Sequence, residues 1–263
     1  MNRFGARMRV IGFCCCLASY AAHGAELTVY PSSLPDYMIT TGPTLAQSSG
    51  MMMEIAAAAF GAAHLRVELA PSSPWPRAQA LAIHQPGAIL LVLAQSPQRF
   101  PDWRWLSVVY TDTLYGFTLR GRARYSSLAQ IKQSKPRVAA KLGAAAVSLM
   151  QTMGIAVDAS PASDDNFMKL VTGKADVLLM QGMAVYPALQ SLRQGPHQVL
   201  FSQWIPTFQL TPVMAIPLWV VTSLATPPAE AQKIADALDR FKTTAQYRAI
   251  VKKYQARFER ATH

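Results

Sequence analysis

The chain has 263 residues, with 25 basic and 14 acidic side chains and a formal net charge of +11. This length can bury a sizeable core without disulfide support. The basic residues are spread along the chain without interleaved aromatic residues, which argues against nucleic acid as a partner. A net positive charge suits an anionic ligand or surface, and a solvated basic face is the simpler interpretation.

The first 24 residues are predicted to be a cleaved secretory signal. Arg3, Arg7 and Arg9 precede an apolar stretch at 10–20, and small residues follow as far as Ala25. This order is typical of an export signal, so we expect cleavage after Gly24 or Ala25 and a periplasmic location. The apolar stretch is about half of the roughly 20 residues that span a bilayer, and an uncleaved anchor is the alternative.

All three cysteines, at 14–16, lie inside the predicted signal. A lipoprotein is a further alternative, although Phe13 stands where such a signal needs a small residue. Cleavage leaves 22 basic and 14 acidic residues, a net charge of +8, and no thiol for a disulfide, a nucleophile or a metal. The histidines lack ligand spacing, so we expect neither a metal nor a cofactor.

Strand and helix patterns alternate in the first part of the mature chain. Strands are expected at 26–30, 65–69 and 88–93, and helices between them at 51–63 and 74–84. The continuous apolar run at 88–93 is typical of a strand buried on both faces. The alternation predicts an α/β unit with a mainly parallel sheet.

A second α/β unit begins near Tyr115. Its strands are expected at 114–119, 138–141 and 176–180, and its helices at 126–133, 143–153, 164–172 and 181–192. Segments 199–201 and 208–210 are expected to return, with the two crossings between the units near 110–115 and 202–211. Apolar residues at helical spacing follow near the C-terminus. We therefore predict lobe 1 from residues 25–112 plus 212–263, and lobe 2 from residues 113–211.

Enzymatic signatures are missing from the sequence. It contains no G-x-S-x-G, H-E-x-x-H, Walker or G-x-G-x-x-G motif. A Ser/His/Asp triad that assembles only in space stays open. We assign no catalytic residue and look instead for groups that bind a ligand.

Five candidate binding positions follow or open predicted elements. Arg99 follows a buried strand, at the edge where open α/β sheets bind ligands. Its planar guanidinium suits a carboxylate, and a surface position is the alternative. Trp75 and Arg77 flank Pro76 at a helix start, and Tyr37 lies in a loop after the first strand. The aromatic residues either form a wall for a ligand or pack in the core.

The fifth position is the run Gly143-Ala144-Ala145, which opens a helix after a strand. Exposed N–H groups at such a place form an anion site. An ordinary helix start is the alternative.

Four segments carry a resemblance to a known family. They are Pro74-Trp75-Pro76-Arg77-Ala78, Ser96-Pro97-Gln98-Arg99, residues 166–176 (NFMKLVTGKAD) and residues 247–254 (YRAIVKKY). In the order and spacing of these segments, the chain resembles the bacterial family 3 extracellular solute-binding proteins, the amino-acid-type receptors of ABC importers. The first segment looks like a PW-x-RA branch of this family.

The resemblance implies a type II periplasmic binding protein fold, with two α/β lobes, two hinge crossings and a ligand cleft between the lobes. It also implies a monomer that binds a small solute and docks on an ABC permease. By position, Arg99 would hold a ligand carboxylate, Ser96 replaces the usual threonine, and Tyr37 would be an aromatic wall.

Two departures from the family pattern change the expected ligand. Gly143-Ala144-Ala145 lacks the usual hydroxyl groups, and Gln181 stands where an aspartate usually holds the ligand's ammonium group. We therefore expect a small organic acid rather than a standard α-amino acid. A sensor or accessory binding protein, and a dehydratase-like enzyme on the same fold, are the alternative functions.

Overall fold

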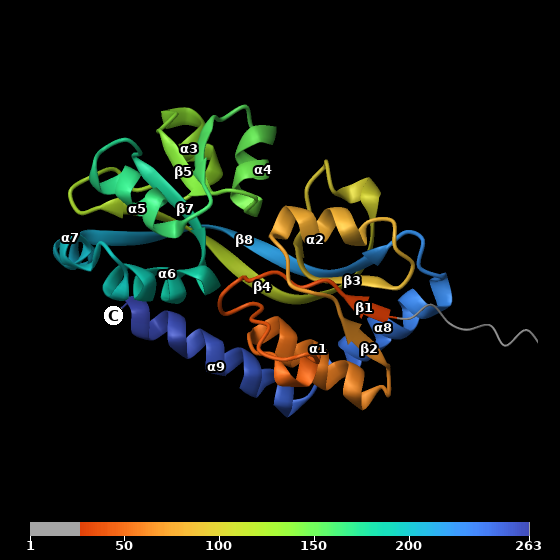
Figure 1. Ribbon diagram of the computed structural model, residues 1–263. Helices are drawn as coiled ribbons and strands as arrows, with labels where there is room; N and C mark the ends of the chain where they lie inside the picture. Colours follow the sequence, from red (N-terminus) through yellow and green to blue (C-terminus); the bar gives the residue numbers. More distant parts are fainter. Residues whose placement is uncertain (1–26, 263) are drawn as a thin grey trace, which may run out of the picture.

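The structure, a computed structural model, describes residues 27–262 (Figure 1). The predicted signal and its cleavage site lie outside these residues. Within 27–262, no helix combines the length and the apolar character needed to cross a membrane.

Strands and helices alternate along most of the described chain. The strands are β1 (Leu27–Val29), β2 (Val67–Leu69), β3 (Ala88–Ala94), β4 (Trp103–Leu119), β5 (Val138–Lys141), β6 (Val157–Ser160), β7 (Val177–Gln181) and β8 (Phe208–Ser223). The helices are α1 (Met51–Ala62), α2 (Trp75–Ala82), α3 (Leu128–Ser134), α4 (Ala145–Thr152), α5 (Ser163–Val171), α6 (Gly182–Gln194), α7 (Gln198–Trp204), α8 (Pro228–Lys242) and α9 (Ala245–Thr262). Short 3-10 turns lie at Leu45–Gln47, Phe100–Asp102 and Ile205–Thr207.

The strands form one sheet in the order β2-β1-β3-β8-β4-β7-β5-β6. Strands β1, β2 and β3 run parallel at one end, and β5, β6 and β7 run parallel at the other. The long strands β4 and β8 are antiparallel to each other and connect the two ends. We call the β1–β3 end with α1, α2 and α8 the first lobe, and the β5–β7 end with α3 to α7 the second lobe (Figure 1).

This architecture confirms the predicted α/β fold class. The predicted lobe boundaries, 112/113 and 211/212, fall within β4 and β8, and these boundaries stay a prediction. Two local expectations differ from the structure. Residues 199–201, expected as a returning segment, lie in α7, and β4 begins at Trp103 rather than near 114. The return is made by β8, whose ladder with β4 extends far into both lobes.

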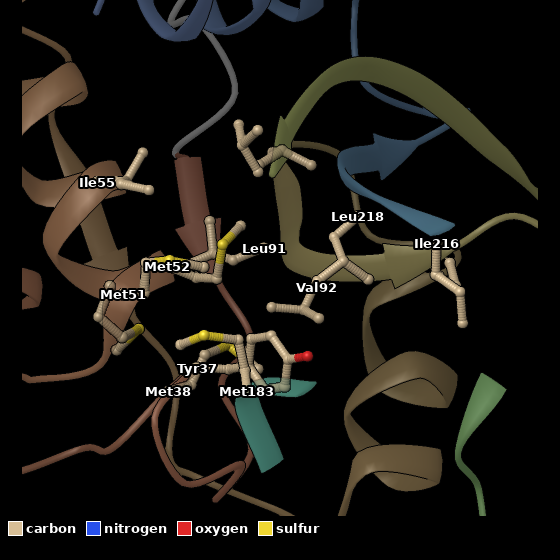
Figure 2. Close-up of a cluster of buried hydrophobic side chains, with 14 of the residues drawn as sticks. Tyr37, Met38, Met51, Met52, Ile55, Leu91, Val92, Met183, Ile216 and Leu218 are labelled. Carbon is tan, nitrogen blue, oxygen red and sulfur yellow. The ribbon is translucent and has the colours of Figure 1, made fainter. Parts of the chain in front are cut away.

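The hydrophobic core is continuous between the lobes. One cluster joins residues of α1 and β3 in the first lobe to residues of β5, β7 and α6 in the second. Figure 2 shows Met183 of α6 beside Tyr37 and Met38 of the first lobe. A second cluster belongs mainly to the second lobe, where the ring of Phe117 meets that of Phe167 edge-on at a centroid distance of 5.1 Å.

Asp112 on β4 connects the lobes through hydrogen bonds. Its carboxylate accepts from the hydroxyl of Tyr37 in the first lobe, from Thr113 N at 2.7 Å, and from Met183 N at 3.3 Å. Gly182 at the start of α6 is required here, because a Cβ would lie 2.8 Å from Asp112 Oδ1. The carboxylate thus occupies the N-terminus of α6, where the helix dipole favours a negative charge.

Helix α9 forms another connection between the lobes. On the first lobe, Tyr254 Oη donates to Glu54 Oε1 at 2.5 Å and accepts from Gly50 N at 2.9 Å. Arg257 pairs with Asp36 and lies 4.7 Å above the centre of the Tyr254 ring. These contacts hold the loop that carries Tyr37.

The last turns of α9 reach the second lobe. The ring of Phe258 lies 5.1 Å from that of Tyr115, and Ala261 belongs to the core cluster of the second lobe. Figure 1 shows α9 running below α1 and α6, on the other side of β4 and β8 from α2 and α4. The helix therefore supports both lobes from that side.

We predict that Leu178→Ala lowers the free energy of unfolding by about 2–5 kcal/mol, because Leu178 on β7 is fully buried between two strands. Leu224→Ala is the matched control. Leu224 is 52% exposed after β8, and its loss is expected to cost less than about 0.5 kcal/mol. Urea unfolding of the mature protein, followed by circular dichroism, measures both values. Similar losses for the two variants would contradict the central position of β7.

We also predict a pH-dependent difference between the wild type and Asp112→Asn. Burial raises the pKa of Asp112 above its ordinary value of 3.8, and it outweighs the hydrogen bonds that lower the pKa. A carboxyl group with a raised pKa stabilises the folded state below its unfolded pKa, and this contribution is lost as the pH rises through the folded pKa. The stability of the wild type relative to Asp112→Asn should therefore fall as the pH is raised from 3.8. Each tenfold difference in the ionisation constant corresponds to about 1.4 kcal/mol.

Asp176→Asn is the control for the sign of this effect. The hydrogen bond from Arg137 lowers the pKa of Asp176, so its contribution is present above pH 3.8 and lost as the pH falls through the folded pKa. Urea titrations at a series of pH values give both differences. If the stability of the wild type relative to Asp112→Asn increased with pH, the raised pKa of Asp112 would be contradicted.

Candidate functional site

A cavity of about 940 Å³ lies between the two lobes. Its lining includes Ser32 after β1, Ala94 at the end of β3, Lys141 at the end of β5 and Gln181 at the end of β7. The carboxyl ends of four parallel strands therefore meet at this cavity. Open α/β sheets bind their ligands at this edge.

Arg99 is the charged group of the first-lobe wall. It is half-buried, lines the cavity and ends the turn that follows β3, which its backbone N–H closes by donating to Ser96 O at 3.0 Å. Its guanidinium donates to Ala94 O at 3.3 Å. Among the described residues, no carboxylate pairs with it. Burial lowers the pKa of Arg99, but a guanidinium stays charged in proteins, so its remaining donors suit an anion.

The two aromatic candidates on the first-lobe wall differ in role. Trp75 is half-buried, packs against the core and lines the cavity. Tyr37 also lines the cavity, but it is 4% exposed and its hydroxyl is used by Asp112. Burial and the nearby Asp112 carboxylate raise the pKa of Tyr37 well above its ordinary value, so it stays a neutral donor.

The structure places Ser96 and Arg77 outside the cavity lining. Arg77 is exposed, because one step along α2 turns it by about 100° from the neighbouring position that faces the cleft. The Ser96 hydroxyl is buried without a hydrogen-bond partner among the described residues, and the backbone carbonyl of Ser96 supports the turn at Arg99. Neither residue belongs to the cavity lining, and a ligand contact by either one stays a prediction.

The predicted second-lobe positions all line the cavity. Gly143, Ala144 and Ala145 come directly before or at the start of α4, whose first N–H groups have no acceptor within the helix. Gly143 has a φ of +77°, and a Cβ there would lie 3.6 Å from Pro76 Cγ of the first lobe. The two lobes thus come into near contact on this side of the cleft.

Gln181 lines the cavity at the junction of β7 and α6. It precedes α6 without making a side-chain capping hydrogen bond. The backbone N–H of Met183 in the first turn of α6 is used by Asp112. The side chain that lines the cavity at this position is therefore a neutral amide. Whether Gln181 contacts a ligand stays a prediction.

Two charged residues of the cavity lining were not predicted from the sequence. Lys141 ends β5, and Asp164 stands in the first turn of α5, where it accepts a hydrogen bond from Ser191 Oγ at 3.0 Å. Lys141 follows the same rule that identified Arg99, because it stands at the carboxyl end of a parallel strand. With Arg99 and Lys141 against Asp164, the charged lining has a net charge of +1.

No described part of the chain brings together three or more His, Cys, Asp or Glu residues that could hold a metal ion. The rest of the cavity wall is largely apolar, with Val92, Leu114, Leu179 and Leu218 among its residues. Such a site binds a small molecule by enclosing an apolar body and fixing a few polar groups.

The sequence matches no protein-family model and no curated protein. Solved structures of similar fold include a histidine kinase sensor domain with similarity to periplasmic binding proteins, at 14% identity and a TM-score of 0.67, covering 88% of this chain and 95% of that one. Another is an ancestral amino-acid-binding protein described as a precursor of cyclohexadienyl dehydratase, at 13% identity and a TM-score of 0.62, covering 88% and 95%.

A third is the substrate binding protein of an amino acid ABC transporter, at 12% identity and a TM-score of 0.59, covering 88% of this chain and 99% of that one. At these identities the likeness establishes the fold. The likeness covers nearly the full length of the solved chains. The chain has the fold of the two-lobed periplasmic binding proteins.

Proposed function

We propose that the mature chain is a periplasmic solute-binding protein that captures a small carboxylate-bearing solute between its lobes and delivers it to an ABC-type importer. The observation that carries this proposal is the half-buried guanidinium of Arg99, which faces a largely apolar cavity without a carboxylate partner among the described residues.

The chemistry of Arg99 favours a carboxylate ligand. A guanidinium presents N–H donors in a planar fork that matches the two oxygens of a carboxylate. Hydrogen bonds to a charged group contribute more than neutral ones, and partial burial in an apolar wall reduces competition from water. The surrounding apolar side chains then favour a solute with an apolar body.

The arrangement of the lobes supports capture by closure. The cavity has walls from both lobes, and the lobes share only β4 and β8 within the sheet. Hinge closure around a ligand is a known class of motion in such two-lobed proteins. The export signal predicted at residues 1–24 is consistent with a receptor that works in the periplasm.

A sensor is the second candidate function. A histidine kinase sensor domain shares the fold at the TM-score given above. A sensor and an importer subunit need the same solute-binding cleft and differ in the partner that recognises the closed form. Neighbouring genes for a permease and an ATPase would favour the importer.

We predict that freshly purified mature protein carries a small anionic molecule that native mass spectrometry detects. Arg99→Met should lose it and should weaken carboxylate binding, measured by calorimetry, by roughly 10- to 150-fold, because about 1.5–3 kcal/mol of charge-assisted hydrogen bonding is removed. Incubation of the bound molecule with excess protein also tests for turnover, which would favour the dehydratase-like alternative.

Arg77→Met is the matched control for this experiment, because Arg77 is exposed and lies outside the cavity lining. It should bind as the wild type does. The proposal fails if Arg99→Met retains wild-type binding, or if the wild type neither carries an anion nor binds any small carboxylate.

A further inference from the structure

Lys141 is a half-buried lysine without a partner in the part of the chain that the structure describes. It lines the cavity at the end of β5, and no hydrogen bond or ion pair satisfies its ammonium group among residues 27–262. Beside largely apolar side chains, this ammonium has no acid among the described residues to pair with, so it is available to an anionic group of a solute in the cavity.

The pairing of other partly buried lysines in the same chain supports this interpretation. The side chain of Lys169 is 14% exposed and pairs with Asp158 at 2.6 Å. That of Lys242 is 30% exposed and pairs with Asp239 at 2.8 Å. The chain thus pairs these two partly buried lysines with acids of its own, whereas Lys141 faces the cavity unpaired.

Arg99 and Lys141 belong to opposite walls of the cavity. Arg99 follows β3 in the first lobe and Lys141 ends β5 in the second. A solute held between the lobes therefore meets one cation from each. The apolar residues Val92, Leu114 and Leu218, which also line the cavity, favour an apolar spacer between two anionic ends.

The charged lining favours anionic groups over an ammonium group of the solute. Asp164 is the only carboxylate among the described lining residues, and one of its oxygens accepts a hydrogen bond from Ser191, whereas two cations of the lining have no carboxylate partner among the described residues. Gln181 is neutral. The volume of about 940 Å³ is near the upper end of the roughly 300–1,000 Å³ of small-molecule sites, which leaves room for a solute longer than most amino acids.

We propose that the solute is a dicarboxylate with an apolar spacer, and that Lys141 selects it by binding the second carboxylate while Arg99 binds the first. This inference rests on the proposed function, since it assigns the class of solute to the same cleft. Dianions bridge the two lobes, so Lys141 contributes to closure as well as to specificity.

Calorimetry with linear α,ω-dicarboxylates of four to ten carbons tests the inference. At the best chain length, the dicarboxylate is compared with the monocarboxylate and the 2-amino dicarboxylate of the same length. The dicarboxylate should bind at least about 10-fold more tightly than either. The monocarboxylate lacks one favourable interaction, and the 2-amino compound adds an unpaired charge.

Variants of Lys141 test whether this residue causes the preference for dicarboxylates. Lys141→Gln should weaken dicarboxylate binding by about 10- to 100-fold and leave monocarboxylate binding within about twofold. Lys141→Arg, which keeps the charge, should retain the preference. Lys132→Gln on the exposed surface of α3 is the matched control and should change neither affinity. Circular dichroism confirms that each variant is folded.

The outcomes separate this inference from the proposed function. If monocarboxylates bind as tightly as dicarboxylates and only Arg99→Met weakens them, the inference is wrong and the function stands. Tighter binding of the 2-amino compound that is lost in Asp164→Asn would also overturn it. If the wild type binds none of these acids and carries no anion when purified, both the function and the inference fail.

Discussion

The antiparallel pairing of β4 with β8 is the constraint on which the rest of the molecule depends. The ladder extends from Trp103 opposite Ser223 to Leu119 opposite Phe208, with three register shifts along it. Strand β3 pairs with β8 on one side and β7 pairs with β4 on the other. Each lobe is thus attached to a different edge of the same two-stranded ribbon, and the carboxyl ends of its parallel strands face the cavity between them.

Contacts outside the sheet restrict how the lobes move about this ribbon. Asp112 lies on β4 and accepts hydrogen bonds from both lobes, and α9 packs on both from the side opposite α2 and α4. These contacts lie near the ribbon, whereas Pro76 and Gly143 approach each other across the cleft. We expect opening to separate Pro76 from Gly143 more than it separates the groups bound to Asp112, as in hinge motion.

Much of the fold could be predicted from the sequence, because its parallel strands are short apolar runs between helical segments. Residues 138–141 match β5 completely, and the helix expected at 51–63 matches α1 to within one residue. Strand β6 was missed, since Val157–Ser160 is a half-buried edge strand without an apolar run. Residues 199–201 are apolar but form part of α7, which tertiary packing of Phe201 stabilises in the second-lobe core.

The candidate site was predicted in part. The strand-end rule identified Arg99, and the same rule applied to the last residue of 138–141 identifies Lys141. Ser96 was suggested only by its position in the family pattern, and Arg77 only by its place beside Pro76 at a helix start. Neither criterion determines which side of a turn or helix faces the cleft. The connections made by Asp112 could not be predicted, because it contacts residues more than 70 positions away whose proximity only the folded chain establishes.

The central claim is that the cleft holds an anion between a cation of each lobe. A crystal structure of the protein with its bound solute tests this claim most directly. The account predicts electron density for the solute in the cavity, with a carboxylate at hydrogen-bonding distance from the guanidinium of Arg99 and a second anionic group beside the ammonium of Lys141. A solute bound outside this cavity, or one whose anionic groups contact neither residue, would contradict it.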